Sequence, residues 1–168
     1  HRRPVVRGLE QGADVRGEAD AELEVGAPLV AEADARAQAE AGEELAVVER
    51  GRVAAKLFLG ITKEWGLTDT QRQILAGASS RTTIDTWKKR VINNEPLNLH
   101  RDTLERLSYI AGIYKGLQML LPTREQWAAW VKKPNRDLGG QSALERMLAG
   151  RVMDLAFVRN YLDAQRGW

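Results

Sequence analysis

The sequence contains no cysteine and only two histidines among its 168 residues. Without thiols there can be no disulfide bonds, cysteine nucleophiles or Cys-ligated zinc and iron–sulfur centres. The two imidazoles, His1 and His100, lie far apart in the chain, so histidine-based metal or acyl-transfer chemistry would depend on His100 alone. We therefore predict a protein that is not an enzyme and that uses no metal or cofactor.

Long hydrophobic runs are also missing. No stretch approaches the roughly 18 to 20 consecutive apolar residues that a membrane helix requires. The basic opening, His1 to Arg7, leads into Gly8 and Glu10 and not into the apolar core of a secretory signal. We therefore expect a cytoplasmic protein.

Aromatic side chains are absent from the first third of the chain, up to Phe58. Residues 1–50 carry 12 Asp and Glu against 6 Lys and Arg, a net charge of −6, whereas the remainder carries 11 against 19, a net charge of +8. Without large apolar groups this acidic arm cannot offset roughly 1 to 2 kcal/mol of backbone entropy per residue. We predict either a disordered tail or, from its alanine content, a helix over about residues 31–50. The arm could simply solvate the protein or could shield a basic surface.

The hydrophobic pattern changes to helical periodicity after Gly51. Four apolar residues follow at four-residue spacing, which predicts the buried face of a helix: Val53, Leu57, Ile61 and Trp65. Gly66 suits a left-handed residue that ends this helix. Thr68 and Gln71 form a capping box, which predicts a second helix over about residues 69–75.

Residues 67–87 have the layout of a helix-turn-helix. A short capped helix is followed by a turn at Gly77 and by a second helix that Ser79 or Ser80 starts. Short polar and basic side chains at the start of a second helix suit contacts with base edges and phosphates. The candidate DNA-binding residues are Arg81, Thr82, Thr83, Asp85 and Lys88.

The same pattern also fits a plain helical hairpin whose basic run, residues 88–90, is a solvated end. Paired helices with glycine between them occur in many proteins that never bind nucleic acid. A monomer offers few basic contacts, so useful DNA affinity would require a dimer that reads two half-sites. DNA binding and a purely structural helix pair both remain open.

A long amphipathic helix is predicted next, capped by Asp102 and terminated by Pro122. Its apolar stripe is wider than the helix-turn-helix alone can cover, so we expect it to join two modules or to support dimerisation.

A small helical module follows, because capping patterns at Thr123 and Ser142 and stops at Pro134 and Gly150 delimit short helices, with a last helix over about residues 153–164. Its carboxylates have neither a histidine partner nor metal-ligand spacing, and we interpret them as solvated: Asp137, Glu145, Asp154 and Asp163. We thus predict an all-α chain with three parts: an acidic arm (1–50), a helix-turn-helix-like region (51–122) and a C-terminal helical domain (123–168).

Several stretches of the second half resemble the Xre/MbcA/ParS antitoxin family, in the right order. They are residues 106–115 (RLSYIAGIYK), Trp130 with Pro134 and Asn135, residues 139–144 (GGQSAL), Gly150, and residues 158–163 (VRNYLD). Residues 67–87 likewise resemble the Xre-type helix-turn-helix. The resemblance covers about residues 51–168 and leaves the acidic arm unaccounted for.

This resemblance implies an antitoxin of a type II toxin–antitoxin system. Its partner would be a RES-type toxin that uses NAD, either degrading it or transferring its ADP-ribose to a protein, and the C-terminal domain would cover the toxin's active site. It also implies a homodimer within a toxin–antitoxin hetero-oligomer and repression of its own promoter through operator DNA. The alternative is a stand-alone helix-turn-helix transcriptional regulator whose C-terminal domain serves for dimerisation.

The resemblance places toxin binding on the C-terminal helices. The expected toxin-binding residues are Asn135, Ser142, Arg159, Tyr161, Asp163, Arg166 and Trp168. We expect the terminal Asp163, Arg166 and Trp168 to reach the NAD cleft, because an arginine and an aspartate can occupy sites meant for pyrophosphate and ribose. Glycines and leucines are poor interface anchors, so Gly140 and Leu144 should shape the domain instead.

Overall fold

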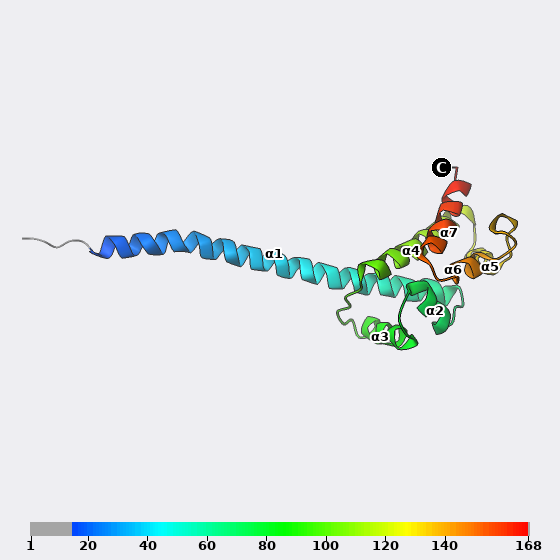
Figure 1. The fold of residues 1–168 in the computed structure, drawn as a ribbon, viewed down its shortest axis with the longest axis horizontal. Coiled ribbons are helices and arrows are strands. Elements are labelled where there is room, and N and C mark those ends of the chain that lie inside the picture. Colours follow the sequence, from blue (N-terminus) through cyan, green and yellow to red (C-terminus); the bar gives the residue numbers. More distant parts are fainter. Residues whose placement is uncertain (1–14, 168) are drawn as a thin grey trace, which may run out of the picture. The chain divides into compact units, whose positions relative to one another are not determined.

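The computed structural model describes residues 15–167, with side chains described from residue 27 onward. All regular elements in these residues are helices, in agreement with the predicted all-α class: α1 (Val15–Glu64), α2 (Asp69–Ala76), α3 (Arg81–Ile92), α4 (Arg101–Leu120), α5 (Arg124–Lys132), the 3-10 helix η1 (Arg136–Leu138), α6 (Ala143–Met147) and α7 (Val152–Gln165) (Figure 1). The chain divides into two compact units, residues 1–44 and 45–168, and α1 contributes to both.

The first unit is helical from Val15 onward, so the acidic arm takes the helical alternative and its helix begins well before residue 31. All side chains described in this unit, from residue 27 to residue 44, are exposed, including Leu29 and Val30. Pro28 lies inside the helix and removes one backbone hydrogen bond. Local propensity, mainly that of alanine, therefore supports this part of α1, and core packing does not.

The second unit has one continuous hydrophobic core, to which every α-helix contributes. The core takes Phe58 and Ile61 from α1 and Trp65 from the turn directly after it, each at most 2% exposed. The Phe58 ring meets Trp87 of α3 edge to face, with centroids 6.1 Å apart. This contact fastens the helix-turn-helix to the end of α1.

The predicted buried face of α1 is partly wrong, because Val53 and Leu57 are 50% and 48% exposed. A strict four-residue spacing advances about 40° around a helix at each step, so Val53 and Trp65 differ by about 120°. The face that is buried combines three- and four-residue steps: Ala55, Phe58, Ile61, Thr62 and Trp65.

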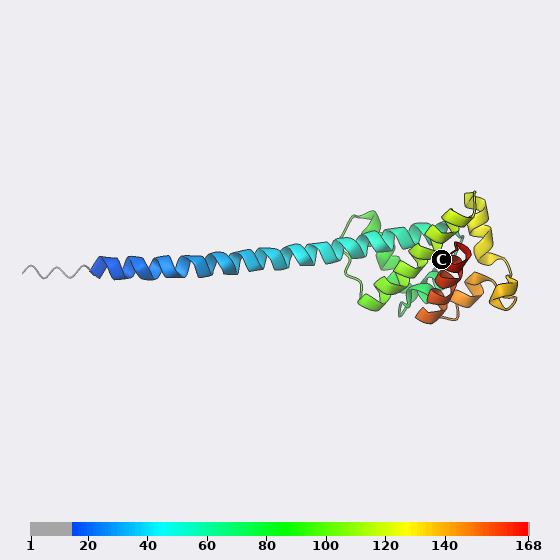
Figure 2. The same cartoon turned by 90° about the horizontal axis from the view of Figure 1, so that it is seen from above.

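Helices α4 and α7 pack along one another and form the centre of the C-terminal part. They lie side by side in both views, α4 in green and α7 in orange to red (Figure 1, Figure 2). The lack of a side chain at Gly116 lets Leu162 approach α4 closely, since a Cβ there would lie 3.4 Å from the Leu162 Cβ. The buried Leu117, Leu155 and Val158 complete this contact.

The predicted helix boundaries need small corrections. Helix α4 begins at Arg101 after His100, so Asp102 is not its cap but a residue of its first turn, where a carboxylate still interacts favourably with the helix dipole. Ser80 precedes α3 without a side-chain capping bond. The Ser142 hydroxyl does cap α6, accepting a hydrogen bond from the Glu145 N–H at 3.0 Å. No helix in residues 15–167 combines the length and apolar content needed to cross a membrane.

Candidate functional site

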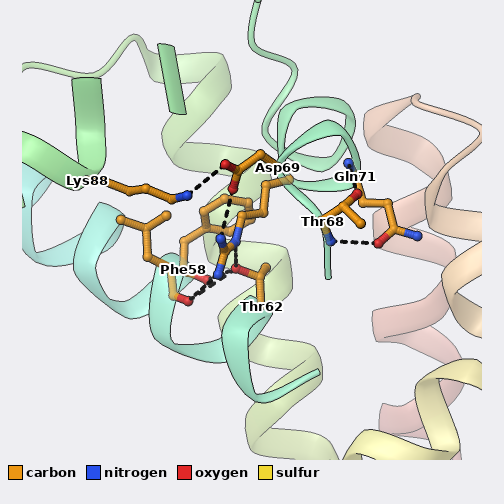
Figure 3. A network of polar contacts seen from close by, with 8 residues as sticks. Phe58, Thr62, Thr68, Asp69, Gln71 and Lys88 are labelled. Atoms are coloured by element: carbon orange, nitrogen blue, oxygen red, sulfur yellow. Dashed lines mark hydrogen bonds and ion pairs between the residues drawn. The ribbon is translucent and has the colours of Figure 1, made fainter. Parts of the chain in front are cut away.

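The helix-turn-helix is built by local capping at both ends of α2. Thr68 and Gln71 satisfy each other's backbone N–H groups, at 2.9 Å and 3.2 Å, in the predicted capping box (Figure 3). Gly77 ends α2 in the left-handed region with φ of 65°. A Cβ at this position would lie 2.7 Å from Nε of Arg106 on α4. Glycine therefore serves both the turn and the close approach of α4.

Asp69 connects three helices in the network shown in Figure 3. Its two carboxylate oxygens accept from Lys88 Nζ at 2.7 Å and from Arg72 Nη1 at 2.9 Å. Arg72 is itself buried and donates from Nε to the Thr62 hydroxyl at 2.7 Å and from Nη2 to the Leu59 carbonyl at 3.2 Å. The hydrogen bonds from Lys88 and then Arg72 hold the pKa of Asp69 below its usual value. The network locks α3 against α2 and α1.

The candidate DNA-binding residues do not share one environment. Arg81, Thr82 and Asp85 are exposed on α3, opposite the buried Ile84 and Trp87. They form a polar helix face without an apolar interruption, as a surface that reads a nucleic-acid groove requires.

Thr83 is half-buried, and Lys88 is held by Asp69. Lys89, seven residues and therefore about two turns beyond Thr82, is exposed on the same side as the polar face. The helical spacing that places Lys89 on the polar face can be read from the sequence. The choice between Lys88 and Lys89 cannot, because it depends on the ion pair between Lys88 and Asp69.

In the C-terminal domain the structure brings Asn135 and Tyr161 together. The Tyr161 hydroxyl donates to Asp137 Oδ2 at 2.8 Å and accepts from Asn135 Nδ2 at 3.5 Å. The Tyr161 ring stacks on Trp130, with centroids 6.2 Å apart and an interplanar angle of 19°. Asn135 also caps η1 through its side-chain oxygen. These contacts hold the loop after α5 against α7.

Arg159, Asp163 and Arg166 form a second cluster on α7. Asp163 lies 3.6 Å from Arg159 Nε and 3.3 Å from Arg166 Nη1, so one carboxylate serves both arginines. The Arg159 guanidinium crosses α4 at Gly112, where any Cβ would overlap it. Trp168 lies outside the described residues. Ser142 is 2% exposed and engaged in its cap, so it builds the domain and offers little surface to a partner.

Sequence reasoning missed a third cluster, centred on Asp154. The interpretation of Asp154 as a solvated carboxylate is wrong, because its side chain is 1% exposed. It accepts from Arg146 Nε at 3.0 Å and from Arg151 Nε at 3.2 Å. The hydrogen bond from Arg151 is the main cause that keeps the pKa of Asp154 below its usual value. The guanidinium of Arg146 in turn lies 4.1 Å from the ring centroid of Phe157.

In the described part of the chain, no three His, Asp or Glu side chains come together as possible metal ligands. The three clusters of the C-terminal domain consist of ion pairs, hydrogen bonds and stacked rings. Such arrangements fix the orientation of side chains and supply neither an activated nucleophile nor an acid–base pair.

Comparison with known proteins agrees with this geometry. Residues 44–112 match the antitoxin Xre-like helix-turn-helix domain, and residues 116–167 match the antitoxin Xre/MbcA/ParS C-terminal toxin-binding domain. A protein of Sinorhizobium fredii (strain NBRC 101917 / NGR234), named only as the uncharacterized protein y4oB, is 41% identical over 121 residues, which make up 71% of this chain and 90% of that protein.

The chain belongs to the Xre/MbcA/ParS antitoxin family. It is a binding protein and not an enzyme, with a helix-turn-helix followed by a domain that binds a toxin. The resemblance drawn from residues 106–163 is thereby confirmed.

Proposed function

We propose that the chain neutralises a RES-type toxin, which uses NAD, by covering the toxin's active site with its C-terminal domain. The match of residues 116–167 to a toxin-binding domain carries this proposal. The Asp163 cluster adds a chemical reason, since two arginines fixed around one carboxylate present charges of both signs close to the end of α7. Such a pair complements a cleft that binds the pyrophosphate and ribose of NAD.

The test uses the protein encoded by the gene next to the antitoxin gene. The two proteins are expressed together, so that the chain protects the host cells, and are then separated for the assay. The neighbouring product alone should consume NAD, or transfer ADP-ribose from it, and stoichiometric addition of the chain should stop this activity. A partner that binds the chain but leaves NAD intact would refute the RES assignment.

A truncation tests whether the end of the chain reaches the active site. Leu162 belongs to the core, so the cut must follow it. Deletion of residues 166–168 keeps the whole of α7, including Leu162 and Asp163, and the contact between α4 and α7. We expect this variant to unfold like the full chain and to bind the toxin but to inhibit it less. Full inhibition by the truncated chain would contradict the covering mechanism.

We also propose that the exposed face of α3 binds operator DNA and represses the promoter. Arg81, Thr82 and Lys89 are the residues we expect to reach the groove, because Lys88 is already paired. A gel shift with the promoter fragment should weaken steeply as salt rises, since phosphate contacts release counterions. Arg81→Ala and Lys89→Ala should each lower the DNA affinity, and unchanged binding by the double variant would exclude α3 as the reading helix.

A homodimer would supply the two half-sites that this DNA binding needs. Its support is an apolar groove of about 500 Å³ between α1 and α4, lined by Val47, Leu57, Leu104 and Ala111 among others. The half-exposed Leu57 would gain burial in such a dimer. Light scattering coupled to gel filtration would show a mass of twice the chain, and Leu57→Glu should shift it towards the monomer.

A further inference from the structure

Helix α7 carries an uncharged stripe on its exposed side. The stripe consists of Met153, Phe157, Asn160 and Ala164, which follow at helical spacing and therefore share one face. All four are exposed, with Met153 at 72% and Phe157 at 39%. The solvent side of a surface helix is normally polar and charged. An exposed stripe that begins with two large apolar groups is instead typical of a surface that a partner covers.

The two apolar residues of the α7 stripe stand out within their domain. Among the described residues 116–167, three large hydrophobic side chains are exposed, and the third is Met119 on α4. Met153 and Phe157 lie one turn apart, so they form a joint surface, whereas the residues one turn before Met119 in α4 are the exposed Lys115 and the buried Gly116. The stripe is therefore an anchor surface, and Met119 is an exposed apolar residue of the ordinary kind.

Arg146 is fixed beside the α7 stripe. Its guanidinium lies 4.1 Å from the Phe157 centroid, and its Nε donates to the buried Asp154 at 3.0 Å. The second ion pair of Asp154, with Arg151, holds that carboxylate in place. An arginine that is already oriented loses less side-chain entropy when it binds a partner. Methionine, phenylalanine and arginine are also enriched in protein interfaces.

We infer that the cognate toxin docks on the α7 stripe, with Met153 and Phe157 as apolar anchors and Arg146 as the cation beside them. The inference rests on the toxin-binding role of the domain and concerns a different side of α7 from the Asp163 cluster. The matching toxin surface is an apolar depression with a carboxylate or carbonyl oxygen facing Arg146. The stripe holds the toxin, and the end of the chain acts on its active site.

The experiment measures the affinity of the purified full chain for the product of the neighbouring gene by titration calorimetry. Met153→Glu and Phe157→Ser should each raise the Kd at least about tenfold, because a charge or a gap replaces a buried anchor. Met119→Glu is the matched control and should leave the Kd within about twofold. Thermal unfolding followed by circular dichroism should show that all three variants fold, since each replaced side chain is exposed.

Three results would overturn the inference. Wild-type affinity in both stripe variants would show that the toxin docks elsewhere, while inhibition by the wild-type chain would leave the proposed function standing. An equal loss of affinity in Met119→Glu would show that the stripe contributes no more to toxin binding than another exposed apolar residue does. A wild-type chain that does not bind the neighbouring product would overturn the stripe and the proposed partner together. A partner that binds through the stripe but does not use NAD would support the stripe and refute only the RES assignment.

Discussion

Asp69, at the start of α2, forms ion pairs with Arg72 of the same helix and with Lys88 of α3, and so links the two helices of the helix-turn-helix. Arg72 is buried, so its charge depends on Asp69, Thr62 and the Leu59 carbonyl for compensation. Removing the carboxylate would leave a buried cation without its ionic partner. We expect Asp69→Asn to lower the free energy of unfolding at neutral pH by roughly 1 to 3 kcal/mol.

The effect of Asp69→Asn should depend on pH. The folded pKa of Asp69 lies below its usual value, so its stabilising contribution is complete above about pH 3.9 and disappears as the pH falls through the lower folded pKa. Urea unfolding of wild type and variant at a series of pH values should therefore show a difference that is constant near neutrality and shrinks in acid below about pH 3.9. A difference that persists unchanged in strong acid would mean that the carboxylate is not paired in the folded protein.

At the scale of single elements, α1 has a glycine at the point where the backbone near Leu97 approaches it closely. Gly51 is buried, and a Cβ there would overlap the carbonyl oxygen of Leu97 in the segment that leads to α4. Gly60, in the same helix, is exposed and has no neighbouring atom within 4 Å of such a Cβ. Two glycines of one helix therefore serve different purposes.

These glycines make a matched pair of substitutions. Gly60→Ala should stabilise the protein by about 0.5 to 1 kcal/mol, because alanine is the better helix former. Gly51→Ala gains the same propensity but must displace a backbone carbonyl, so we expect a net loss of roughly 1 to 3 kcal/mol. Chemical denaturation measures both. Similar effects of the two substitutions would show that the segment at Leu97 moves freely away from α1.

How far the sequence predicts an element depends on how local its cause is. The capping boxes at Thr68 and Thr123 are recognisable because each joins residues three apart, and both are present. The burial of Asp154 was not predictable, because Arg146 reaches it across the turn at Gly150. Likewise, only the position of α2 shows that Lys88 is paired and that Lys89 is the better candidate for DNA contact. The family pattern located the toxin-binding domain, whereas its exposed stripe needed the folded helix.

At the scale of the whole molecule, the core formed by the described side chains lies in residues 45–167. The side chains of residues 27–44 are exposed, so their removal takes away no buried apolar surface. We expect the fragment 45–168 to unfold at the same temperature as the full chain, within about 2 °C, and to bind the toxin equally well. Differential scanning calorimetry and the titration described above would measure this. A much lower Tm for the fragment would give the acidic arm a structural role that its exposure does not suggest.

The distribution of aromatic rings has an optical consequence. All five tryptophans follow Phe58 in the sequence, and Trp65 and Trp87 are buried near the helix-turn-helix while Trp127 and Trp130 are half-buried in the C-terminal domain. Tryptophan emission therefore reports on the second unit and is blind to the acidic arm. The arm can be cut, labelled or replaced without altering the intrinsic fluorescent signal, and any change in that signal can be assigned to the helix-turn-helix or to the toxin-binding domain.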